Sequence, residues 1–131
     1  MNALSGVKFD ANGLVAAVVQ DGSNGEVLMV GYMNREAIER TLSTGRVTFW
    51  SRSRQKYWVK GETSGNVQEL RGLFVDCDLD CILVKVEQTG PACHEGYRSC
   101  FFRRVTENGE SLETIADRVK APAEIYPSPA K

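Results

Sequence analysis

The stretch "FVDCDLDCILVKV" (74–86) places three aspartates and two cysteines directly before an apolar run. Side chains alternate along a β-strand, so a strand here would put Asp76, Asp78 and Asp80 on one face and the cysteines on the other. Carboxylates this close raise the pKa values of one another unless a cation neutralises them. Oxygen ligands of this kind suit Mg²⁺ or Ca²⁺. The stretch therefore predicts a β-rich fold with a metal site, and the alternative is a solvated acidic face without a metal.

An EF-hand is excluded as the source of this acidic pattern. The tight turn of an EF-hand loop needs a glycine where this chain has Cys81, and the following "ILVKV" has the pattern of a strand. The metal site predicted here would therefore lie on a sheet.

The rest of the chain consists mostly of short apolar segments separated by polar turns. Residues 13–21 and 26–33 predict a hairpin, and residues 46–61 predict a second hairpin with aromatic strands around a basic turn. One or two strands are predicted over 67–88, with a break near Gly72. A further strand is predicted at the segment "CFFRRV", followed by a turn at "ENGE".

Two short helices accompany these strands in the prediction. Residues 34–45 can form one, with Asn34 as its N-cap and Gly45 as its end. Residues 112–120 can form a second after Ser111. We therefore predict a mainly β or α+β fold, with a compact, mostly antiparallel, barrel-like sheet and one or two short helices.

Length and charge narrow the class of protein. The 131 residues predict one domain over residues 1–110, followed by the C-terminal helix and a Pro-rich flexible tail over residues 111–131. The formal net charge of −1 argues against a general nucleic-acid or membrane binder. No signal-peptide pattern and no run of about 20 apolar residues is found. We expect a cytoplasmic protein whose four cysteines are thiols or metal ligands.

A second group of candidate metal ligands lies in "GPACHEGYRSC", which holds Cys93, the single histidine His94, and Cys100. The cysteine spacing is wider than in zinc knuckles, so buried thiols without a metal are the alternative. Together with Cys77 the chain offers three thiolates, and three protein ligands plus one open position are typical of catalytic zinc. Cys81 as a fourth ligand would instead close a structural site, and both possibilities stay open here.

A third pattern is basic and aromatic. Residues 40–60 contain six arginines and lysines and no acidic residue, with tryptophans and a tyrosine between them. Such a segment, with the loop "KGETSGN", can hold phosphates and stack a base. The alternatives are an exposed basic hairpin with core tryptophans and a face for single-stranded RNA. The candidate substrate-binding residues are Trp50, Arg52, Arg54, Lys60, Thr63 and Ser64.

Three motifs in collinear order resemble one enzyme family. "FWSRSRQKYWVKGETSGN", "VDCDLDCILVKVEQTGPACH" and "SCFF" are similar to phosphoribosyl-AMP cyclohydrolases of histidine biosynthesis, and the likeness covers about residues 27–105. The resemblance implies an intertwined homodimer. It also implies a reaction in which zinc-activated water opens the adenine ring of 1-(5-phosphoribosyl)-AMP at the N1–C6 bond, the third step of L-histidine biosynthesis.

The resemblance further implies one zinc and one magnesium ion per subunit. Cys77 is expected from the partner subunit, so neither subunit alone would complete the zinc site. The implied ligands are Asp76, Asp78 and Asp80 for magnesium and Cys77, Cys93 and Cys100 for zinc.

His94 matches the family histidine that is a candidate for proton transfer. The chain departs from the family pattern at Glu95, where a threonine is expected, and beyond about Glu107 nothing matches. A zinc-stabilised nucleotide- or RNA-binding module without catalysis is the competing hypothesis.

Overall fold

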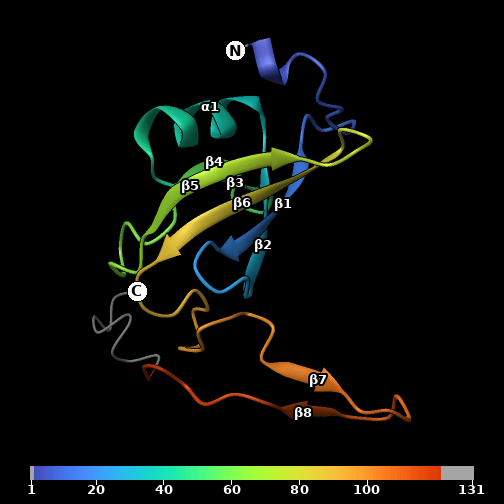
Figure 1. Cartoon of the computed structure of the whole chain (residues 1–131), viewed down its shortest axis with the longest axis vertical. Helices are drawn as coiled ribbons and strands as arrows, with labels where there is room; N and C mark the ends of the chain where they lie inside the picture. The colour runs from blue at the N-terminus through green and yellow to red at the C-terminus, as the bar shows by residue number, and fades with distance from the viewer. Residues whose placement is uncertain (1, 122–131) are drawn as a thin grey trace.

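The computed structural model describes residues 2–121, and statements below about what the structure contains refer to that range. Strands dominate, and Figure 1 shows the single α-helix of the described residues lying to one side of them. In chain order the elements are η1 (Asn2–Leu4), β1 (Val15–Asp21), β2 (Val27–Met33), α1 (Arg35–Thr44), β3 (Thr48–Ser51), β4 (Lys56–Val59), β5 (Gln68–Val75), β6 (Cys81–Gln88), β7 (Arg103–Val105) and β8 (Leu112–Thr114). The prediction of a mainly β fold is confirmed.

The main sheet has four strands in the order β2-β1-β6-β5 (Figure 1). The β1–β2 and β5–β6 pairs are antiparallel, while the central β1–β6 pair is parallel, with Ala16 opposite Cys81. The sheet is mixed and open, so the prediction of a barrel-like form is wrong. The physical reason is that β3 and β4 pair with each other and do not join the strand order of the main sheet, to which the chain before β3 is linked by an isolated bridge between Arg46 and Glu69.

The helix α1 forms where its capping signals predict it. The Asn34 side chain accepts a hydrogen bond from the Ala37 N–H at 2.9 Å. At the other end Gly45 has φ 76°, and its N–H bonds the Thr41 carbonyl at 3.0 Å. The helix buries Ala37, Ile38 and Thr41, which fixes its orientation on the molecule. No helix among residues 2–121 is long and apolar enough to cross a membrane.

The core lies between one face of the main sheet and the β3–β4 hairpin with α1. Phe49 on β3 is fully buried and stacks on Trp58 at a ring distance of 4.8 Å. Gly31 on β2 faces this ring so closely that an added Cβ would meet it at 2.5 Å. Other buried members of this core include Val19, Leu28, Met33, Ile38, Val47, Ile82, Val84 and Val86.

Two strand predictions change in detail. The irregularity near Gly72 is a register shift within β5 rather than a break between strands. The strand boundary falls later, at residues 76–80, where the chain turns from β5 into β6.

The predicted helix over 112–120 is wrong. Residues 112–114 form β8, which pairs with β7, and residues 115–121 contain no helix. Leu112, Ile115 and Val119 are all more than half exposed, so no core covers the face that an amphipathic helix would need for stability. The β7–β8 hairpin stands apart from the main sheet (Figure 1). Most of the predicted Pro-rich tail, residues 122–131, lies outside the described range, and the domain boundary stays a prediction.

Candidate functional site

The three aspartates lie in the tight turn between β5 and β6, here called the aspartate turn (residues 76–80). Asp76 N–H donates to the Cys81 carbonyl at 3.0 Å, and Leu79 N–H donates back to the Asp76 carbonyl at 3.1 Å. Leu79 has φ 65°, a left-handed conformation that a strand cannot contain. The prediction that strand alternation separates aspartates from cysteines is therefore wrong, because the same pattern closes a hairpin.

The aspartates nevertheless meet. One carboxylate oxygen from each of Asp76, Asp78 and Asp80 lies within 4.8 Å of the others, and among residues 2–121 they form the one such group of three or more potential ligands. The pKa of Asp76 is lowered overall. Desolvation acts to raise it, but the hydrogen bonds that its carboxylate accepts from the N–H groups of Asp80 and Cys81 outweigh that effect. The pKa of Asp80 is raised, first by the hydrogen bond between its side chain and that of Asp78. Desolvation and the negative charges of Asp78 and Asp76 raise it further. A hard divalent cation fits this set, since it would relieve the repulsion.

The other candidate ligands lie in the segment after β6, called the cysteine loop (residues 89–102). Cys93 is 4% exposed, whereas His94 and Cys100 are exposed. Although Cys100 is exposed as a residue, partial burial of its thiol raises the pKa to about 11, with Cys93 adding to the rise. Two thiols close enough to influence the pKa of Cys100 are soft donors that fit zinc.

Lys60 lies against the cysteine loop. Its ammonium donates to the Ala92 carbonyl at 2.5 Å. Burial lowers the pKa of Lys60, and the nearby thiols of Cys100 and Cys93 oppose that shift. Lys60 is thus separated from Arg52, its neighbour in the predicted substrate-binding set.

Trp50 and Arg52 line a cavity of about 350 Å³. The Arg52 guanidinium carbon lies 3.8 Å above the centre of the Tyr32 ring. The Trp50 ring meets Tyr57 edge-on at 4.8 Å. In the sequence Asn34 is recognisable only as a helix cap, and no local pattern points to the other polar residues of this cavity. Its lining residues are Asn12, Leu14, Asn34, Trp50, Arg52 and Gln55.

The remaining predicted substrate-binding residues do not line this cavity. Arg54 is exposed in the turn between β3 and β4. Thr63 is exposed and Ser64 half-buried in the loop that follows β4. Their roles stay predictions.

The aspartate turn and the cysteine loop lie at opposite ends of the main sheet, here called the aspartate end and the cysteine end (Figure 1). The aspartate turn precedes β6 and the cysteine loop follows it, and eight residues of strand span about 26 Å. Leu14 of the Trp50 cavity directly precedes β1, which runs parallel to β6, so this cavity lies at the aspartate end. Within one chain Cys77 therefore lies far from Cys93.

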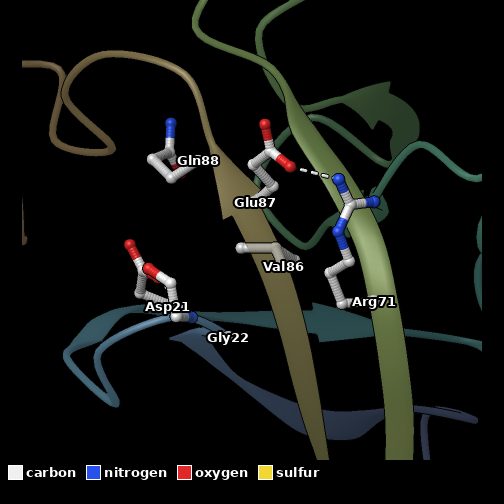
Figure 2. A pocket seen from close by; sticks show the side chains of 7 residues that line it. Asp21, Gly22, Arg71, Val86, Glu87 and Gln88 are labelled. Carbon is white, nitrogen blue, oxygen red and sulfur yellow. Dashed lines mark hydrogen bonds and ion pairs between the residues drawn. The ribbon is translucent and has the colours of Figure 1, made fainter.

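A second cavity, of about 480 Å³, opens at the cysteine end of the sheet (Figure 2). None of the predicted site residues lines it. Its charged groups are paired, Arg71 with Glu87 and Asp21 with Arg98. The lining residues are Asp21, Gly22, Ser23, Arg71, Val86, Glu87 and Gln88.

Comparison with known proteins identifies the family. Residues 29–102 match the family model described as phosphoribosyl-AMP cyclohydrolase. A protein of that name from Ruegeria pomeroyi is 60% identical over 112 residues, covering 86% of this chain and 93% of the relative. Namesakes from Methanococcoides burtonii and Pelotomaculum thermopropionicum are 50% and 53% identical over 123 residues, covering 94% of this chain and 98% and 95% of the relatives. The resemblance and the predicted class of enzyme are confirmed: the chain belongs to the phosphoribosyl-AMP cyclohydrolase family.

Proposed function

We propose that this protein opens the adenine ring of 1-(5-phosphoribosyl)-AMP by hydrolysis of the N1–C6 bond, in histidine biosynthesis. The observation that carries the proposal is the family match over residues 29–102, because every candidate catalytic, metal and substrate residue falls inside that range. A cytoplasmic location is part of the same proposal.

The donor sets support two different metal ions. The carboxylates of the aspartate turn suit Mg²⁺, a hard cation that prefers oxygen ligands. Cys93 and Cys100, joined by Cys77 of a second copy, would hold Zn²⁺ with one position left open. When bound there, zinc supplies a Lewis acid that activates water near neutral pH.

The residues of the chain have separate tasks in this mechanism. His94 is exposed beside Cys93, where it can move a proton between water and the purine nitrogen that leaves C6. Trp50 can stack on the purine, and Arg52 can pair with a phosphate. Lys60, whose ammonium is partly desolvated, can hold the other phosphate at the cysteine end.

A two-fold homodimer supplies what one chain lacks. The aspartate turn and the Trp50 cavity lie about one strand length from the cysteine loop, so an isologous dimer can join the two ends in two equivalent sites. The apolar side chains of the β7–β8 region support association, since a monomer leaves them in water. Val105, Leu112, Ile115 and Val119 are each 56–61% exposed.

The test is direct turnover. Phosphoribosyl-AMP is added to protein loaded with zinc and magnesium, and ring opening is followed by absorbance. We expect activity that a chelator removes and zinc restores. No turnover in the fully loaded protein would contradict the proposed reaction, and nucleotide or RNA binding without turnover would favour the non-catalytic module.

A further inference from the structure

The cysteine loop keeps its shape without a helix or strand of its own. At its base, Ala92 N–H donates to the Arg98 carbonyl at 3.0 Å. Beyond that closure, Cys100 N–H donates to the Leu28 carbonyl on β2 at 2.7 Å. Arg98 therefore stands between the two candidate ligands Cys93 and Cys100, at the point where the loop closes.

The Arg98 side chain leaves the loop and bonds the sheet. One guanidinium nitrogen, Nη2, pairs with the Asp21 carboxylate at the end of β1. The other, Nη1, donates to the carbonyls of Gln88 and Gly90, each at 3.3 Å, and Nε lies 3.6 Å from Glu26. A planar guanidinium can make these contacts at once, and a single ammonium cannot. Arg98 thus joins the loop to the ends of β1 and β6.

The Asp21 carboxylate is built into the fold rather than placed on its surface. Asp21 is 4% exposed, and its Oδ1 accepts bonds from the Ser23 N–H at 2.8 Å and the Ser23 hydroxyl at 2.6 Å. A buried carboxylate needs a cationic partner, and Arg98 provides it. Across the cavity in Figure 2, Arg71 and Glu87 form an ion pair of a different kind, because both of its side chains are exposed.

We propose that Arg98 and Asp21 are positioning residues that hold the cysteine loop in the geometry its thiols need for metal binding. The inference rests on the proposed function, since it takes Cys93 and Cys100 as zinc ligands. Groups that orient metal ligands commonly contribute 10- to 100-fold to metal affinity or activity. Neither residue touches substrate in this inference, so their effect passes through the loop.

The experiment measures zinc affinity by competition with a chromophoric chelator, on full-length protein that circular dichroism shows to be folded. Arg98→Lys keeps the charge beside Asp21 but loses the simultaneous bonds to two carbonyls. We expect its zinc Kd to rise about tenfold. At saturating zinc we expect kcat to fall while KM for substrate stays near the wild-type value.

A second variant keeps the proposal testable if Arg98→Lys does not fold. Asp21→Asn combined with Arg98→Gln removes both charges together, so no buried charge is left unpaired. We expect the same weakening of zinc binding from this pair. The matched control is Arg71→Gln, which breaks the exposed ion pair on the same sheet and should leave zinc Kd unchanged.

The outcomes separate this inference from the proposed function. Wild-type zinc Kd and kcat in both the lysine variant and the double variant would overturn the positioning role, even if the thermal midpoint fell. Equal weakening in Arg71→Gln would overturn it as well. A wild-type protein that binds no zinc, or whose binding survives Cys93→Ser, would overturn the proposed zinc site itself.

Discussion

The role of one residue, Cys81, distinguishes a catalytic zinc site with three protein ligands from a structural site with four. Its half-buried thiol lies at the start of β6 and donates to the Ile82 carbonyl at 3.9 Å, whereas Cys77 in the aspartate turn is exposed and can reach the site of a second copy. We expect Cys81→Ser to retain zinc and activity and Cys93→Ser to lose both. Zinc content by elemental analysis checks this, and loss of zinc from Cys81→Ser would contradict an open site.

Asp21 gives a prediction about acid stability. Hydrogen bonding from Ser23 lowers its pKa below the usual 3.8, against desolvation, and Arg98 adds to the lowering. A carboxyl with a lowered pKa in the folded protein stabilises it above the unfolded value, and that contribution disappears as pH falls through the folded value. We therefore expect the wild type to exceed Asp21→Asn in unfolding free energy at about pH 7, with a smaller difference at about pH 3. Urea melts at both pH values test this, and a constant difference would contradict it.

At the scale of elements, the local signals in the sequence predicted more than the long-range ones. Asn34 and Gly45 specify α1 by bonds within a few residues, so the helix could be predicted. Alternating acids and cysteines fit a strand and a hairpin turn equally well until Leu79 adopts its left-handed backbone. The parallel pairing of β1 with β6 depends on residues far apart in the chain, and no local pattern encodes it.

The candidate site shows the same division. Residue types and order predicted that the three aspartates would gather. They did not predict that the Lys60 ammonium would bond the Ala92 carbonyl of the cysteine loop, because these two residues lie 32 positions apart in the chain. Arg98 and Asp21, 77 residues apart, likewise have no local signature.

The contact between β2 and β3 gives a prediction about packing. A methyl group at Gly31 would meet the buried Phe49 ring at 2.5–2.6 Å, and such overpacking costs about 1–3 kcal/mol. We expect Gly31→Ala to lower the unfolding free energy by that amount. The matched control is Gly6→Ala, whose Cβ would make an ordinary 3.5 Å contact with Leu79. Denaturant melts of both variants measure the unfolding free energy. Equal stability of the two variants would show that β2 and β3 pack less tightly.

At the scale of the whole molecule, a shared zinc site predicts complementation between inactive subunits. Cys77→Ser and Cys93→Ser homodimers should both be inactive. In a mixed dimer one site keeps Cys93 of one chain and Cys77 of the other, while the second site loses both. Random exchange of equal amounts should therefore restore about a quarter of wild-type activity. Activity after refolding the two variants together tests this, and no recovery despite mixed dimers would contradict the shared site.

The parallel β1–β6 pair also has a consequence for synthesis on the ribosome. β1 and β2 can form their hairpin early. The strand that pairs with the other edge of β1 is β6, and it is translated about sixty residues later. At a translation rate of roughly 5–20 residues per second, this edge of β1 stays unpaired for several seconds. Ala17 and Val19, fully buried in the finished protein, remain uncovered by their neighbouring strand during that interval. The nascent chain is thus most vulnerable to aggregation before β6 emerges, and a chaperone that binds apolar strands would act in this window.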